Sequence, residues 1–105
     1  MATLLRLPID ETQLFEYCRR WKITKLEVFG SARFDWAAAN DVDLLVSFAA
    51  EAQWSLMDHV EMQQELGELL DRPVDLVTRR SIEASHNTIR RAAILNDTVE
   101  VYATK

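Results

Sequence analysis

The stretch FGSARFDWAAANDVDLLV, residues 29–46, governs how the rest of the sequence is interpreted. It contains one of only two glycines in the chain, placed directly before a serine, and it ends in an apolar run that two aspartates, Asp41 and Asp43, introduce. The two-residue period of a β-strand over 42–48 puts both aspartates on the same face. Carboxylates beside an apolar strand are costly unless something pairs with them, so these two indicate a binding site.

Hydrophobic periodicity predicts the other elements on both sides of this stretch. Before it, we expect a helix capped by Asp10 that runs to about Trp21, and a short strand over 25–29. After it, we expect a helix from Ser55 to about Leu70 and strands over 74–78 and 98–103. A further helix, capped by Ser81 and running to about Asn96, would bury Ile82, Ile89 and Ala93. The predicted order is α-β-loop-β-α-β-α-β, an α/β (α+β) fold class.

Composition limits the classes of protein that the chain can belong to. A chain of 105 residues that is 49% hydrophobic predicts a single compact domain over 1–105. The formal charge of -5 argues against long nucleic acid as a partner. The only cysteine, Cys18, is expected to be a buried packing residue, and no apolar stretch has the length of a signal or membrane segment. We therefore expect a soluble, cytoplasmic protein that is not associated with a membrane.

The aspartates form a pattern suited to divalent cations. Asp41 and Asp43 lie about 7 Å apart along their strand, at ~3.3 Å per residue, so their carboxylates can converge on shared ions. Two magnesium ions form the usual clamp for in-line displacement at phosphorus, and that arrangement commonly needs a third carboxylate. Asp75, near the start of another apolar strand, is the candidate third ligand. It is also placed to help deprotonate an attacking hydroxyl group.

The turn after Phe29 predicts a phosphate-binding loop. A turn entering a short helix exposes backbone N–H groups, Gly30 lets a phosphate approach them, and Ser31 adds a hydroxyl donor. Arg33 can reach terminal phosphates as a forked cation. Two alternatives stay open, since Ser31 could cap the following helix and Arg33 could form a surface ion pair with Asp35.

These residues together resemble a known family. The segments 30–33 (GSAR), 40–46 (NDVDLLV) and 73–77 (PVDLV) are similar to the minimal nucleotidyltransferases of the polymerase-β-like superfamily, and the resemblance covers nearly the whole chain. It implies a mixed β-sheet flanked by helices, a metal triad at Asp41, Asp43 and Asp75, and phosphate binding at Gly30 and Ser31. Arg33 matches the usual arginine of the motif. The chain departs from the family at 34–35, where a glycine is often found, and at Asn40, where the family often has serine.

The resemblance also implies an activity and a partner. Small proteins of this family often act as antitoxins beside an all-helical HEPN ribonuclease, either by transferring AMP from ATP to a tyrosine of that partner or by binding it. We therefore expect a magnesium-dependent nucleotidyltransferase that uses ATP and works in a complex, as a hetero-oligomer or homo-oligomer. A binding module without catalysis is the alternative, and transfer to a small molecule is a less favoured third reading, because those enzymes generally carry a second domain.

Several other residues have two interpretations. Phe34 and Trp36 lie between strands, where they could contact a base or a partner, or fold back onto the core. His59 and His86 have no companion at metal-ligand spacing and are interpreted as structural or surface residues. The arginine pairs at 79–80 and 90–91 could meet an acidic partner or RNA, but solvated faces are the commoner outcome.

Overall fold

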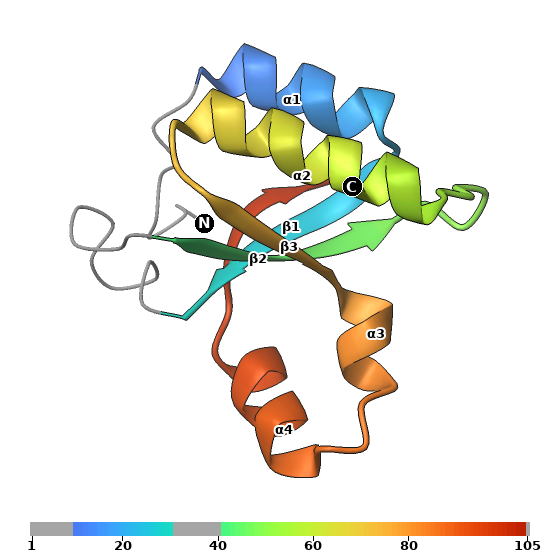
Figure 1. Ribbon diagram of the computed structural model, residues 1–105, viewed down its shortest axis with the longest axis vertical. Helices are drawn as coiled ribbons and strands as arrows, with labels where there is room; N and C mark the ends of the chain where they lie inside the picture. The colour runs from blue at the N-terminus through green and yellow to red at the C-terminus, as the bar shows by residue number, and fades with distance from the viewer. Residues whose placement is uncertain (1–9, 31–40, 105) are drawn as a thin grey trace.

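A four-stranded mixed sheet forms the centre of the protein (Figure 1). The computed structural model describes residues 10–30 and 41–104. The strands are β1 (Ile23–Phe29), β2 (Val42–Phe48), β3 (Val74–Thr78) and β4 (Val99–Ala103), in the spatial order β3-β2-β1-β4. β1 pairs antiparallel with β2 and with β4, whereas β2 and β3 are parallel. The mixed sheet implied by the resemblance is thus confirmed.

Two helices cover one face of this sheet, and both begin where their capping residues lie. α1 (Glu11–Arg20) starts after Asp10, whose side chain accepts a hydrogen bond from the Thr12 N–H. α2 (Leu56–Leu70) starts with a capping box, in which Ser55 and Asp58 each accept from the other's backbone N–H. Figure 1 shows α1 and α2 lying side by side above the strands. The predicted positions of both helices are confirmed.

The main core lies between these helices and the sheet. Strand alternation sends Leu26, Leu44 and Val46 toward the helices, and all three side chains are fully buried. Tyr17 of α1 is also buried, and its hydroxyl donates to the Met62 carbonyl of α2 over 2.9 Å. Each large apolar side chain buried here contributes about 1.5–3 kcal/mol to the free energy of folding. This layer fixes the register of the strands, because a one-residue slip would turn their apolar side chains away from the helices.

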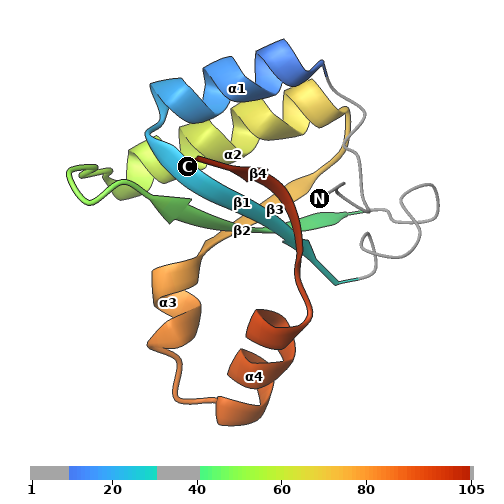
Figure 2. The same ribbon diagram turned by 180° about the vertical axis from the view of Figure 1, so that it is seen from behind.

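The opposite face of the sheet carries a smaller unit, which we call the α3–α4 arm (residues 79–98). It comprises α3 (Arg79–Glu83) and α4 (Thr88–Asn96), and Figure 2 shows both helices below the sheet, away from α1 and α2. Ile82 and Ile94 are buried against Leu45 of β2 in a second apolar cluster. Asp75 of β3, which lies on the same face, stays exposed, so the arm covers this face only in part.

The arm corrects one prediction from the sequence. A single helix from Ser81 to Asn96 is wrong, because Thr78 caps α3 and Asn87 caps a separate helix, α4. Ser85 Oγ accepts from the Asn87 N–H, so short polar side chains satisfy the backbone outside a helix here. Restarting the helix changes its phase, which leaves Ile89 83% exposed and Ala93 exposed, while Ile82 is buried as expected.

A buried carboxylate ties the arm to the sheet. Glu27 of β1 is only 4% exposed, and it points to the outer face between Leu26 and Val28. Its Oε1 accepts from Arg79 Nη1 over 2.7 Å, and its Oε2 accepts from Thr98 Oγ1 over 2.5 Å. Arg79 begins the arm and Thr98 ends it. One side chain therefore holds both ends of the arm.

The free edge of β3 is occupied by side chains of α2. The Leu76 N–H donates to Gln63 Oε1 over 2.9 Å. The Leu76 carbonyl oxygen in turn accepts a hydrogen bond from His59 Nε2 over 2.6 Å. His59 thus has the structural role expected for it.

No helix among residues 10–30 and 41–104 is both long enough and apolar enough to cross a membrane.

Candidate active site

Parallel pairing of β2 and β3 brings two of the predicted acids together. Asp43 and Asp75 are direct Cα partners in the register of these strands. Both alternate with core residues, since Val42 and Leu44 flank Asp43 and Val74 and Leu76 flank Asp75. The two carboxylates therefore extend from neighbouring positions on the outer face. Asp41 directly precedes β2 and is exposed.

Gly30 lies directly against the carboxylate of Asp43. It follows Phe29, the antiparallel partner of Asp43, and it has φ +79°, a conformation that side chains disfavour. A Cβ atom at this position would lie 2.5 Å from Asp43 Oδ2, closer than any non-bonded contact permits. A glycine is required here both for the backbone angle and for the close approach of the carboxylate.

The electrostatics of the site centre on Asp43. Partial burial raises the pKa of its carboxyl group, and the neighbouring charges of Asp75 and Asp41 raise it further. The guanidinium of Arg90, on α4, opposes this effect by lowering the Asp43 pKa. The charges of Asp41 and Asp75 thus repel that of Asp43, and a bound cation would relieve this repulsion.

The donor set has the chemistry of a magnesium site. Carboxylate oxygens are the protein ligands that Mg²⁺ prefers, and three acids with mutually unfavourable charges provide them. Among residues 10–30 and 41–104, no three acid, histidine or cysteine side chains already stand at the spacing of a formed metal site. Asp41, Asp43 and Asp75 therefore fit the ion by their charge and by their place at the start of β2 and β3, whereas their side chains do not stand at the spacing of a formed site.

The predicted site residues are only partly within the described chain. Gly30, Asp43 and Asp75 come together with Asp41 next to them. Ser31 and Arg33, together with Phe34, Asp35, Trp36 and Asn40, fall in 31–40, outside the described residues. Arg90, whose charge lowers the Asp43 pKa, was interpreted from the sequence as part of a basic pair that is typical of a solvated helix.

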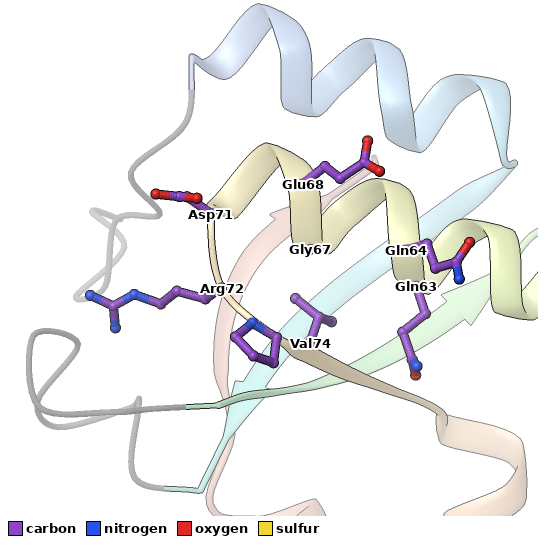
Figure 3. A pocket seen from close by; sticks show the side chains of 8 residues that line it. Gln63, Gln64, Gly67, Glu68, Asp71, Arg72 and Val74 are labelled. Atoms are coloured by element: carbon purple, nitrogen blue, oxygen red, sulfur yellow. The ribbon is translucent and has the colours of Figure 1, made fainter.

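Two other features lie apart from the acids. Cys18 is fully buried, and burial raises the pKa of its thiol to about 12, which agrees with a packing role. A shallow hollow of about 710 Å³ lies at the turn from α2 to β3, where Figure 3 shows Gly67, Asp71 and Arg72 among its lining residues. Neither Asp43 nor Asp75 lines this hollow, so it is separate from the candidate site.

Comparison with known families identifies the chain. A family described as "Nucleotidyltransferase domain" matches residues 11–100. The chain belongs to this family. One nucleotidyltransferase relative, "Putative protein adenylyltransferase MJ0126" from Methanocaldococcus jannaschii, is 30% identical over 87 residues, which cover 82% of this chain and 84% of the relative.

Several solved structures share this fold. A structure described as a "putative minimal nucleotidyltransferase" is 30% identical, has a TM-score of 0.60, and aligns over 83% of this chain and 84% of its own. A toxin-antitoxin crystal structure with AMP-PNP has a TM-score of 0.66 at 24% identity, over 92% of this chain and 76% of the other. A tri-AMPylated HEPN toxin from Shewanella oneidensis in complex with an MNT antitoxin gives a TM-score of 0.60 at 24% identity, over 90% and 70%. At 24% identity, the last two likenesses show the fold alone.

Proposed function

We propose that this nucleotidyltransferase transfers AMP from ATP to a hydroxyl group of a partner protein. The observation that carries the proposal is the register of β2 and β3, which sets the partly buried Asp43 beside the exposed Asp75. The Gly30 turn lies against the same carboxylate. Acids on two strands and a glycine turn are the parts that phosphoryl chemistry requires in one place.

The relatives support the choice of AMP and of a protein acceptor. MJ0126 is named a protein adenylyltransferase, and the Shewanella oneidensis structure holds an AMPylated HEPN toxin beside an MNT antitoxin. We infer that the partner of this chain is a helical toxin of the HEPN type, that the acceptor is a tyrosine, and that the chain acts as its antitoxin. Asp75 is exposed, so a protein acceptor can approach it from solvent.

The chemistry follows from the roles of the residues. Asp41, Asp43 and Asp75 would hold two Mg²⁺ ions, which when bound neutralise phosphate charge and lower the pKa of the attacking hydroxyl group. Gly30 and Ser31 would bind phosphate oxygens through backbone N–H groups and the Ser31 hydroxyl, with Arg33 on the terminal phosphates. The acceptor oxygen forms a bond to the α-phosphorus, the bond to the bridging oxygen breaks, and pyrophosphate leaves. Asp75 would receive the acceptor's proton.

The test is label transfer from ATP. The purified protein is incubated with magnesium, a lysate of its source cells and ATP that is radiolabelled on the α-phosphate. We expect one labelled protein band that appears only when the protein is added, and no such additional band when the label is on the γ-phosphate, because nucleotidyl transfer keeps only the α-phosphate. Asp43→Asn should abolish the band.

The matched control is Asp71→Asn. Asp71 is an exposed residue at the C-terminal end of α2 with φ 54°, and asparagine adopts this conformation equally well. The control should label the partner as the wild type does. Equal labelling by wild type and Asp43→Asn would refute the metal assignment. Capture of a helical partner without any label would instead favour an antitoxin that acts by binding alone.

A further inference from the structure

The strand that carries Asp75 stands at one end of the sheet. In the order β3-β2-β1-β4, the described part of the chain pairs β3 with β2 alone. The Pro73 carbonyl accepts from the Val42 N–H over 3.0 Å, so it faces β2. Because backbone groups alternate in direction along a strand, the Asp75 carbonyl also faces β2, whereas the N–H and carbonyl of Leu76 face the free edge. Hydrogen bonds to Leu76 therefore have to come from outside the sheet.

Two side chains of α2 supply these hydrogen bonds. Gln63 Oε1 accepts from the Leu76 N–H over 2.9 Å, and His59 Nε2 donates to the Leu76 carbonyl over 2.6 Å. His59 and Gln63 are four residues apart, so they lie on the same face of the helix, one turn from each other. The helix itself is fixed to the main core by Met62 and Leu66, which are fully buried. α2 thus holds Leu76 through both of its backbone groups.

The hydrogen bond from Gln63 also fixes the backbone of Asp75. The Asp75 carbonyl and the Leu76 N–H belong to one peptide group, which is planar and rigid. Gln63 holds the N–H side of this group, and its carbonyl side faces β2. The Asp75 side chain is exposed, so packing does little to orient it. The direction in which the carboxylate leaves the sheet therefore depends on how this peptide group is held.

We propose that Gln63 and His59 are positioning residues that orient Asp75 for binding of the divalent cation. The inference rests on the proposed function, in which Asp75 is a metal ligand, and it adds two residues of α2 to that site. Neither side chain contacts the cation, since both act through the backbone of β3. Mg²⁺ requires nearly ideal octahedral geometry, so it binds less well to a carboxylate whose backbone is free to rotate.

The experiment measures the affinity of the nucleotide-free protein for MgCl₂ alone by isothermal titration calorimetry. Gln63→Leu keeps the size of the side chain and removes the acceptor of the Leu76 N–H. It should raise the Kd for Mg²⁺ about tenfold, since residues that orient metal ligands commonly have effects of this size. His59→Phe, which removes the donor to the Leu76 carbonyl, should change the Kd in the same direction.

Two further readouts separate orientation of Asp75 from a general loss of structure. Amide hydrogen exchange at Leu76 should be faster in Gln63→Leu, while the circular dichroism spectrum stays that of the wild type. In label transfer, Gln63→Leu should need about tenfold more magnesium for half of its maximal rate and should still reach the wild-type maximum. A smaller folded fraction would instead lower the maximal rate.

The matched control is Gln64→Leu, the same change at the next residue of α2. Figure 3 shows the Gln63 and Gln64 side chains leaving the helix in different directions, and within residues 10–30 and 41–104 Gln64 makes no hydrogen bond to β3. This control should bind Mg²⁺ as the wild type does, and Asp75→Asn gives the reference for a lost ligand. If Asp75→Asn weakens Mg²⁺ binding and Gln63→Leu does not, or if Gln64→Leu weakens it equally, this inference alone is overturned. If Asp75→Asn binds Mg²⁺ like the wild type, the metal assignment of the proposed function fails first, and the inference falls with it.

Discussion

The strongest test of how the arm is held is removal of the Glu27 carboxylate. Glu27 is buried, with its side chain 5% exposed, and it accepts from Arg79 and Thr98 at the two ends of the α3–α4 arm. Lys25 Nζ adds a longer contact of 3.9 Å to the same carboxylate. Glu27→Ala removes the carboxylate that all of these contacts share. The Arg79 guanidinium and the Thr98 hydroxyl then lose Glu27 as their acceptor.

The size of the effect follows from the burial of the partners. Breaking a fully buried ion pair costs about 3–5 kcal/mol. The Arg79 side chain is 31% exposed, so water can replace part of what it loses. We therefore expect Glu27→Ala to lower the free energy of unfolding by about 2–4 kcal/mol. Glu27→Gln keeps the shape and an acceptor, and should cost about 1 kcal/mol through loss of the charge.

Urea denaturation followed by circular dichroism measures both variants. The control is Glu83→Ala, which removes the other acid beside Arg79, a 3.4 Å contact in which the Glu83 side chain is 55% exposed. An exposed pair of this kind is worth about 0.5 kcal/mol. If Glu27→Ala costs no more than Glu83→Ala, Glu27 does not hold the arm and the reasoning is wrong.

Three further outcomes test the site and the core. Gly30→Ala should cost about 1–2 kcal/mol of stability and displace Asp43, so label transfer should fall about 100-fold, whereas Gly67→Ala in α2 should leave transfer intact. The pKa of Asp43 is raised in the folded protein, so its ionised form opposes folding. Asp43→Asn should therefore be more stable than the wild type at pH 7 without magnesium. The difference in urea midpoint between the two proteins should vanish as the pH falls below about 4, where Asp43 is protonated in both states. The Cys18 thiol should react with Ellman's reagent at pH 8 only after unfolding, because its pKa is raised to about 12, and rapid reaction of the native protein would contradict its burial.

Much of the fold could be predicted from periodicity. The alternation over 42–48 placed Asp43 and Leu45 on the face away from the main core, and the structure has them there. Capping residues located the starts of α1 and α2. The neighbouring positions of Asp43 and Asp75 depend on the order of strands, which alternation within one strand does not specify. The resemblance to the minimal nucleotidyltransferases supplied that link.

The residues that could not be predicted depend on what covers the outer face. Glu27 alternates with Leu26 and Val28, so it has the pattern of a solvent-facing strand residue. It is buried because the arm returns to the sheet through Arg79 and Thr98, which are 52 and 71 residues away in sequence. The separate helix α4 depends in the same way on the cap at Asn87, which apolar periodicity does not reveal. One available signal was the run of short polar residues before Thr88, which is typical of a helix start.

The blocked edge of β3 limits how copies of this protein can associate. An exposed strand edge is a template on which another chain can add a strand and begin cross-β aggregation. At the middle of β3, both outward backbone groups of Leu76 are already satisfied by Gln63 and His59. Replacing these two side chains by alanine would expose the edge that lies directly beside Asp75. The acids can therefore stay open to a large partner without leaving the adjacent strand open to self-assembly.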